Sequence, residues 1–336
     1  MTTYINGIGS ISSQTPLNMQ KISGTGQAIR AIEPDYTDWI EPGKLRRMSR
    51  IVTMGVASAM IALRDAAIEK PDAIVTGTGL GCLEDTGTFL RRMLVNIEGG
   101  ITPTPFIQST HNTIGSQIAM LLGCHGYNQT YTHQSFSLES ALLDAQMLVK
   151  ENEDLNVLVG SVDEFTVASH NIMQKFNLFD DNTPHGEGAA YFVVSATKCE
   201  KSYAKLIDQK TFMNPELSQL EDFIRYFITC NNKRFEEIDI LIYGGTRRPG
   251  DAQVNLIINK LFGKVKTIWY KQFCGEYLTS TGFALWLSAM ISKGQMDTND
   301  ILELDNYRKP VRNVLIYNPY LAHHSLILLE SCRDIK

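Results

Sequence analysis

Long apolar segments are missing from this sequence. No run of about 18 hydrophobic residues occurs among its 336 residues, so we expect no membrane-spanning helix. The first residues also lack the basic stretch followed by an apolar stretch that marks a secretory signal. They suggest a first β-strand instead. We therefore expect a cytoplasmic protein.

Cysteine pairs and basic clusters are missing as well. The six cysteines include no CxxC pair and none with metal-ligand spacing to a histidine, which predicts no metal site and fits a reducing compartment. The 36 acidic residues outnumber the 31 lysines and arginines, and a net charge of −5 argues against a nucleic-acid partner. What remains is an ordinary globular composition, with 43% hydrophobic and 20% charged residues.

Apolar strand patterns alternate with helical patterns along the first half of the chain. Buried strands are predicted at 72–81, 156–165 and 186–196, and helices at 51–69 and 138–151. Alternation of this kind predicts parallel strand pairing and the α/β class.

The same pattern starts again after about residue 200. Strands are predicted at 203–212, 238–245 and 266–273, helices over 218–231 and after Thr281, and two further strands close the chain. Two halves with similar element order suggest an internal duplication. We place the boundary so that residues 1–198 form an N-terminal half and residues 199–336 a C-terminal half.

Five short motifs, in matching order and spacing, resemble those of the β-ketoacyl synthases. They are the opening strand YINGIGSIS, the Arg-Met helix segment at 45–66, and the segments VTGTGLGCLED, VLVGSVDEFT and GEGAAYFVV. The resemblance covers most of the chain. It implies the thiolase-like fold, in which two similar halves form a five-layer αβαβα sandwich, and it implies a dimer.

The segment 105–145 resembles the part of a ketosynthase that runs from the dimer-interface helix to the nucleophile elbow. In that register the active-site cysteine of the family falls on Ser135. A serine hydroxyl is far less acidic than a thiol and needs an adjacent base, for which His133 is one candidate. Chain-length factors, the inactive partners of some ketosynthases, carry glutamine at or near this position. Here Gln134 lies one residue before it.

The two catalytic histidines of the family are also replaced. Residues 243–251 resemble its HGTGTxxxD motif and put Tyr243 at the first histidine, and residues 271–285 resemble KSxxGHxxxASG, keep Lys271 and put Glu276 at the second. A phenol is a poor proton shuttle at neutral pH, and a carboxylate would repel the enolate formed during condensation. Glu276 and Lys271 are expected to pair with each other.

The loops around this site differ from the family too. Arg247 and Arg248 belong either to a solvated loop or to a contact with an acidic carrier protein or the phosphate of phosphopantetheine. The flexible glycine run of the family's gating loop is replaced by stiffer, bulkier residues, which argues against gating. These positions are Asn318, Pro319, Tyr320, Leu321 and Ala322. His323 and His324 would point to opposite faces of an extended segment and make a poor metal pair.

Four changes at one site favour a catalytically silent homologue. The resemblance implies a chain-length-factor-like partner of an active ketosynthase in a heterodimer, closest to the proteins of aryl polyene and flexirubin-type pigment pathways. No cofactor would be bound, and the phosphopantetheine arm of an acyl carrier protein would bring the substrate. Helix 112–122 and strand 127–133 would form the interface. Residues near the tunnel would be Thr113, Ser116, Met120, Gln134 and Ser135.

Two other functions stay open at this point. One is a divergent ketosynthase or acyltransferase that uses Ser135 as nucleophile, with His133 as base and Tyr243 as donor. The other is a homodimeric protein that binds an acyl group or a carrier protein without turning it over.

Overall fold

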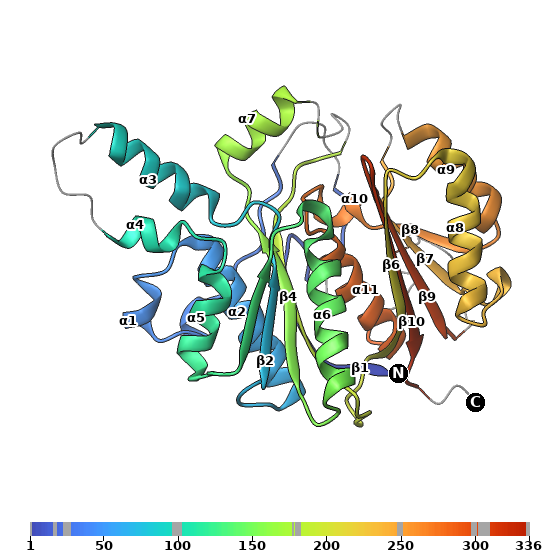
Figure 1. Ribbon diagram of the computed structural model, residues 1–336, viewed down its shortest axis with the longest axis horizontal. Coiled ribbons are helices and arrows are strands. Elements are labelled where there is room, and N and C mark those ends of the chain that lie inside the picture. The colour runs from blue at the N-terminus through green and yellow to red at the C-terminus, as the bar shows by residue number, and fades with distance from the viewer. Residues whose placement is uncertain are drawn as a thin grey trace.

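The computed structural model describes residues 2–15, 19–22, 28–95, 103–176, 178, 183–246, 251–296, 301 and 310–333. Ten strands form one mixed sheet (Figure 1). The strands of the first half are β1 (Thr3–Ile11), β2 (Ala73–Gly77), β3 (Tyr127–Tyr131), β4 (Val157–Asp163) and β5 (Gly188–Ser195). Those of the second half are β6 (Ala204–Met213), β7 (Ile240–Tyr243), β8 (Lys266–Trp269), β9 (Asn313–Tyr320) and β10 (His323–Ser331).

The two halves of the sheet have the same topology. The strand order is β3-β2-β4-β5-β1-β6-β10-β9-β7-β8. In the first half β2 pairs in parallel with β3 and β4, and β5 runs antiparallel to β4 and β1. In the second half β7, β8, β9, β10 and β6 repeat these pairings in the same order. Antiparallel pairing of β1 with β6 joins the halves.

Helices cover both faces of the sheet. They are α1 (Pro42–Leu45), α2 (Arg50–Ala66), α3 (Leu83–Val95), α4 (Pro103–Gln108), α5 (Thr113–Leu122), α6 (Ser137–Glu151), α7 (Val167–Lys175), α8 (Leu217–Cys230), α9 (Ala252–Phe262), α10 (Lys271–Cys274) and α11 (Thr281–Lys293). Three short 3-10 helices are η1 (Tyr36–Asp38), η2 (Gln134–Phe136) and η3 (Phe235–Glu237). Among the described helices, none is both long and apolar enough to cross a bilayer.

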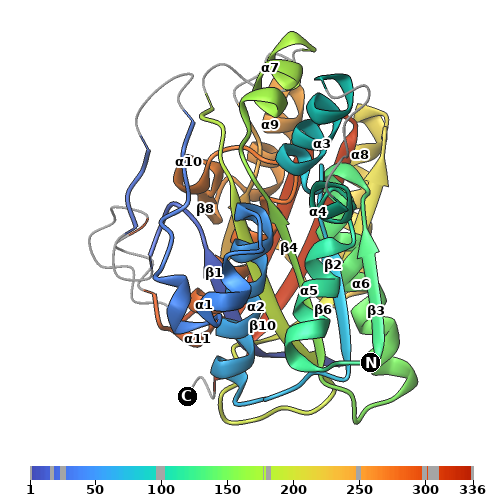
Figure 2. The ribbon, with the colours of Figure 1, turned by 90° about the vertical axis from the view of Figure 1, so that its left-hand side faces the viewer.

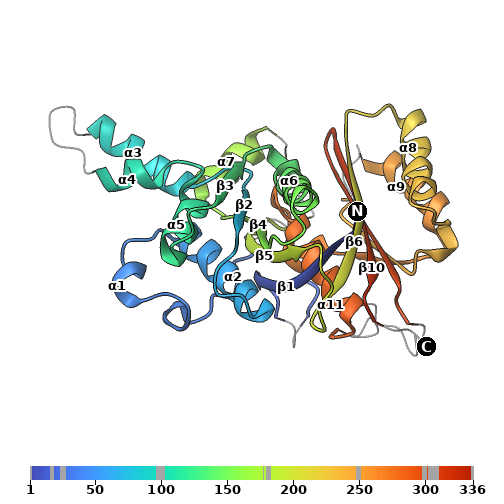
Figure 3. The same cartoon turned by 60° about the horizontal axis from the view of Figure 1, so that its bottom comes forward.

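Five layers pack around three large buried cores. One lies between α2 and α5 and the first half-sheet, the second between the two half-sheets around α6 and α11, and the third between the second half-sheet and α8 and α9 (Figure 3). Alternation along each strand assigns its side chains to these cores. In β7, Ile240 and Ile242 enter the central core, whereas Leu241 and Tyr243 enter the outer one.

The element pattern expected from the sequence is present in both halves. The predicted α/β five-layer architecture is confirmed. One prediction is partly wrong: of the strand expected at 266–273, only Lys266–Trp269 is extended, and residues 271–274 form the single turn α10. The proposed domain boundary falls between β5 and β6. The division into two domains stays a prediction, because one continuous sheet crosses it.

Candidate functional site

A tight turn connects β3 to α6 at the end of the sheet. Gln134 has a φ of 50°, in the left-handed region that costs a residue with a side chain roughly 1–3 kcal/mol. The Ser137 hydroxyl stabilises the turn by accepting from the His133 amide at 2.8 Å and donating to the Thr78 carbonyl at 2.9 Å. Gly77 permits this approach, since a Cβ there would lie 2.6 Å from the Ser137 carbonyl oxygen. The chain thus makes the strained strand-to-helix elbow that exposes nucleophiles in several enzyme folds.

The residue after this strained position is hydrogen-bonded to a histidine. Ser135 Oγ lies 2.7 Å from His323 Nδ1, and the Ser135 side chain is buried. The imidazole of His323 stacks on the Phe136 ring, with centroids 4.4 Å apart and planes at 22°. Burial, helped by nearby His133, lowers the pKa of His323 below its usual 6.5. The ring is therefore neutral at pH 7 and can accept a proton.

The β9–β10 hairpin brings His323 to the elbow. Its two-residue turn consists of Leu321, at a φ of 53°, and Ala322, whose carbonyl accepts from the Asn214 amide at 2.6 Å. His324, the next residue, points the other way and lies 2.7 Å from Tyr317 Oη. Burial lowers the pKa of His324 to about 4. The prediction that the two adjacent histidines face opposite sides is confirmed.

The predicted gating-loop positions belong to this hairpin. Asn318, Pro319 and Tyr320 are the last residues of β9, and the side chain of Asn318 accepts a hydrogen bond from Tyr270 Oη at 2.9 Å. Tyr320 is buried beside Met173 and Leu278. Paired strands and a short turn therefore make up the predicted gating-loop positions.

Replacing Leu321 tests the strain in this turn. Leu321→Gly is expected to be about 1 kcal/mol more stable than Leu321→Ala, because only glycine adopts a positive φ without a Cβ clash. Both variants remove the side chain of Leu321, a residue that is 45% exposed, beyond Cβ, so they differ only in the Cβ methyl group. Urea denaturation of the two variants side by side measures the difference. Equal midpoints would contradict a strained turn.

A buried ion pair lies behind the hairpin. Lys271 Nζ is 2.9 Å from Glu276 Oε1, and the two side chains are 4% and 1% exposed. The pairing expected from the sequence is thus present. The ammonium group also lies 5.9 Å from the ring centroids of Tyr270 and Tyr320. Tyr320 pairs across the hairpin with His323, so the ion pair adjoins the elbow through one tyrosine.

A second buried carboxyl group belongs to α6. Glu139 accepts a hydrogen bond from Ser325 Oγ at 2.7 Å and is almost completely buried. Burial raises its pKa to about 7, although the Ser325 hydrogen bond and the charge of Lys271 act in the opposite direction. Sequence patterns did not identify Glu139, because a single glutamate in a helical repeat gives no sign of its burial.

Two predicted roles at the elbow are wrong. The Tyr243 hydroxyl donates to Asn255 Oδ1 at 2.5 Å in the outer core, because the alternation of β7 turns this side chain away from α6. His133 Nδ1 lies 3.3 Å from Ser140 Oγ. The hydrogen-bond partner of the Ser135 hydroxyl is His323. Tyr243 is therefore no donor and His133 no base for Ser135. Arg247 and Arg248 lie outside the described residues.

The predicted tunnel residues differ in exposure. Thr113 is buried and donates to the Ile107 carbonyl at 2.9 Å, and Ser116 is half-buried. Met120 is 65% exposed. At the elbow Gln134 is exposed and Ser135 buried. A role for these residues in a tunnel stays a prediction.

Sequence reasoning also missed His323 as the partner of Ser135. The two residues are 188 positions apart, and the sequence pattern raises His323 only as one of two adjacent histidines that make a poor metal pair. Recognition of the two-residue turn would have helped, because it fixes the hairpin register. That register pairs His323 with Tyr320 and directs alternate side chains to opposite faces.

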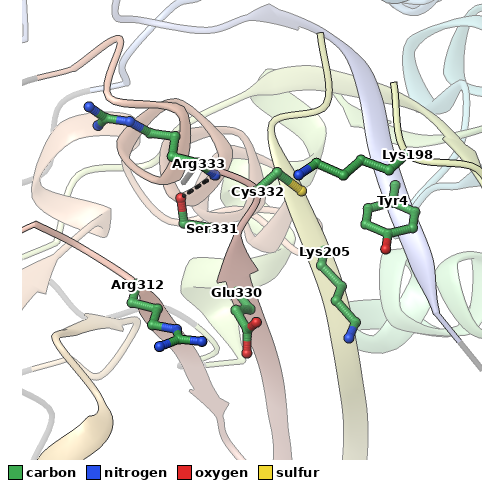
Figure 4. A pocket seen from close by; sticks show the side chains of 8 residues that line it. All are labelled: Tyr4, Lys198, Lys205, Arg312, Glu330, Ser331, Cys332 and Arg333. Atoms are coloured by element: carbon green, nitrogen blue, oxygen red, sulfur yellow. Dashed lines mark hydrogen bonds between the residues drawn. The ribbon is translucent and has the colours of Figure 1, made fainter. Parts of the chain in front are cut away.

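Two open pockets lie away from Ser135. One of about 310 Å³ is bordered by Gly245, Thr246, Trp269, Lys271 and Gln272, so it reaches the ion pair from the loop after β7. A larger hollow of about 420 Å³ lies at the opposite end of β10 from His323. Figure 4 shows its lining, in which basic side chains surround Glu330. These basic residues are Lys198, Lys205, Arg312 and Arg333.

Comparison with known proteins identifies the fold. No protein-family model matches the chain, and neither does any curated protein sequence. A structure described as the ishigamide ketosynthase/chain length factor is 17% identical, with a TM-score of 0.77 over 99% of both chains. The complex of the acyl-carrier protein AntF with the ketosynthase AntDE, bound to a hexaketide, gives 13% identity and a TM-score of 0.78, covering 98% of this chain and 99% of that one.

A third structure holds the ketosynthase ApeO in complex with its chain length factor ApeC, from Xenorhabdus doucetiae. It is 14% identical, with a TM-score of 0.76 over 98% of both chains. Full-length similarity of this kind shows that the chain has the thiolase-like ketosynthase fold.

Proposed function

We propose that this protein is the chain-length-factor-like partner of an active ketosynthase. It would form a heterodimer that extends acyl chains carried by an acyl carrier protein, in a pathway of the polyene pigment type. The phosphopantetheine arm of the carrier would present the chain, and this subunit would bind no cofactor of its own. The observation that carries the proposal is an exposed apolar face beside the elbow.

This face, here called the elbow face, surrounds the outer strand β3. Four large apolar side chains on three elements project from it: Met120 on α5, Tyr127 on β3, and Leu143 and Met147 on α6, exposed by 65%, 44%, 52% and 53%. Figure 2 shows β3 at the margin of the sheet with α5 and α6 beside it. Clustered apolar groups and an open strand edge are features of surfaces that bind another chain.

The residues at the elbow favour a non-condensing partner subunit over a condensing enzyme. In the register of the resemblance, Ser135 stands at the position of the family's thiol, and Glu276, which is buried in its ion pair with Lys271, stands at the position of the second histidine. An ionised Glu276 would oppose the negative charge of an enolate. The condensing thiol and its histidines would therefore come from the partner, across the elbow face.

The similar structures support the same partners. Two of them are described as a ketosynthase with a chain length factor, and another as a ketosynthase complex that contains an acyl-carrier protein. Their sequences are at most 17% identical to this one, so they support the proposal through the fold alone.

Disrupting the elbow face tests the proposal. The protein is co-expressed with a ketosynthase encoded in the same gene cluster, and a stable 1:1 complex is expected on size-exclusion chromatography. Leu143→Glu should weaken this complex at least about 30-fold, because a buried charge would replace an apolar contact of hot-spot size. Affinity is measured by titration of the separately purified chains.

A matched control comes from the opposite side of the molecule. Leu256 on α9 is 68% exposed, so Leu256→Glu introduces the same charge away from the elbow face and should leave the affinity unchanged. A stable homodimer that does not bind the ketosynthase would overturn the proposal in favour of a homodimeric binding protein. Equal effects of the two variants would show that the partner binds elsewhere.

A further inference from the structure

We propose that Ser135 and His323 form a nucleophile–base pair that takes acyl groups from carrier thioesters. The protein would then be more than a passive partner, because it could unload or transfer chains through an acyl-serine ester. The inference rests on the proposed function only for the identity of the acyl donor. The pair itself belongs to this chain alone.

The position of Ser135 is suited to nucleophilic attack. It follows the strained Gln134 in the 3-10 turn η2 and lies two residues before the start of α6, where backbone dipoles favour developing negative charge. The distance of 2.7 Å to His323 is within the range at which a histidine removes a proton from an attacking hydroxyl. Serine with histidine is a general way to activate an otherwise weak nucleophile.

His323 is held in the form that such a base requires. Phe136, the neighbour of Ser135, stacks on the imidazole and fixes the plane of its ring. The cross-strand neighbours Tyr320 and Met213 carry no charge at neutral pH. Burial is the main cause of the lowered pKa of His323, and among the described residues His133 adds to it. Within the described residues, no carboxylate accepts a hydrogen bond from His323. The pair is therefore a dyad, and we expect slower turnover than in a triad.

The reaction balances without any further reagent. With its own proton on Nε2, His323 takes the hydroxyl proton at Nδ1 while Ser135 Oγ attacks the thioester carbonyl carbon. The C–S bond then breaks, and the departing thiolate receives that proton to give the free pantetheine thiol and an acyl-serine ester. In the second half, His323 deprotonates a water molecule that attacks the ester. The C–O bond breaks, Oγ regains a proton, and a carboxylic acid is released.

The experiment uses the full chain, both alone and in complex with the ketosynthase. It is incubated with the hexanoyl thioester of N-acetylcysteamine, and intact-protein mass spectrometry is expected to show one added hexanoyl group. Peptide mapping should place that group on Ser135, which identifies the site even where a variant folds poorly. Ser135→Ala should abolish the modification. His323→Gln should slow it at least about 100-fold, the lower range for loss of a general base.

Two controls separate this role from a structural hydrogen bond. His125→Gln changes an exposed histidine at the other end of β3 from the elbow, and should leave the acylation rate within the spread of replicate measurements. Glutamine at position 323 can still hydrogen-bond to Ser135, so thermal unfolding should change little while acylation falls. Absence of label, label at another residue, or an equal rate in His323→Gln would overturn the proposal.

The result can be told apart from a test of the partner function. A stable complex with the ketosynthase and no acyl-Ser135 would refute the dyad and leave the partner function standing. Acyl-Ser135 in a chain that binds no ketosynthase would support the dyad and refute the partner function.

Discussion

Lys271→Met is expected to lower the free energy of unfolding by about 3–5 kcal/mol, the usual cost of leaving one charge of a buried pair behind. The lysine and Glu276 are 4% and 1% exposed, with their charged atoms 2.9 Å apart. Methionine keeps most of the length of the side chain, so lost packing contributes little. The Glu276 carboxylate would then remain in the interior without the ammonium group that balances it. Urea denaturation measures the change.

A double mutant and a variant of an exposed ion pair are the controls for this test. Adding Glu276→Leu to Lys271→Met should recover most of the lost stability, because replacing a buried ion pair by apolar groups is often close to neutral. Lys260 and Glu221 form an exposed pair of similar length, 2.8 Å, on the outer helices. Lys260→Met should therefore cost less than about 1 kcal/mol. If the double mutant is no more stable than Lys271→Met, the charge left behind is not the cause.

Glu139→Gln is expected to stabilise the protein above pH 7 by up to about 3 kcal/mol. The pKa of Glu139 is about 7 in the folded protein against a usual 4.5, so the folded state binds more protons between these values. Stability of the wild-type protein therefore falls as the pH rises through this window. Glutamine carries no charge and can keep the hydrogen bond from Ser325. The two proteins should be equally stable near pH 4.5 and diverge toward pH 7.

The measurement is a series of unfolding curves between pH 4.5 and pH 8. Glu221 provides a control, because hydrogen bonds from Lys260 and Arg225 lower its pKa below 4.5. The stability that Glu221 contributes is lost only as the pH falls below its usual range. In Glu221→Gln, the free energy of unfolding should therefore change with pH above pH 5 as it does in the wild-type protein. If the free energies of unfolding of the wild-type protein and Glu139→Gln change in parallel with pH, Glu139 does not titrate in this window.

The fold was largely predictable because its signals are local. Alternating strand and helix patterns, together with five short motifs, were enough for the class and the two-half architecture. The elbow was also predictable, since an ungapped register placed Ser135 at the elbow, where the structure has the turn η2 directly before α6. The strand expected at 266–273 ends earlier than predicted, and the reason for this error is also local. Apolar residues around Tyr270 suit a buried turn as well as a buried strand.

The partners within the site were not predictable in the same way. His323 reaches Ser135 across 188 residues, and that contact depends on the register of a hairpin in the other half. Tyr243 fails for a related reason, since one step along β7 decides whether a side chain enters the central or the outer core. The positive φ of Gln134 carries no sequence signal, because the residue that favours such a conformation is glycine.

The order of the strands has a consequence for synthesis on the ribosome. The strand β1 is made first, yet it lies in the middle of the sheet between β5 and β6. Its neighbours are complete only when residues 188–213 have been added. At 5–20 residues per second this takes roughly 10–40 s. During that interval the apolar residues of β1, among them Ile5 and Ile8, have no strand to pair with, so the nascent chain is a natural client for a chaperone.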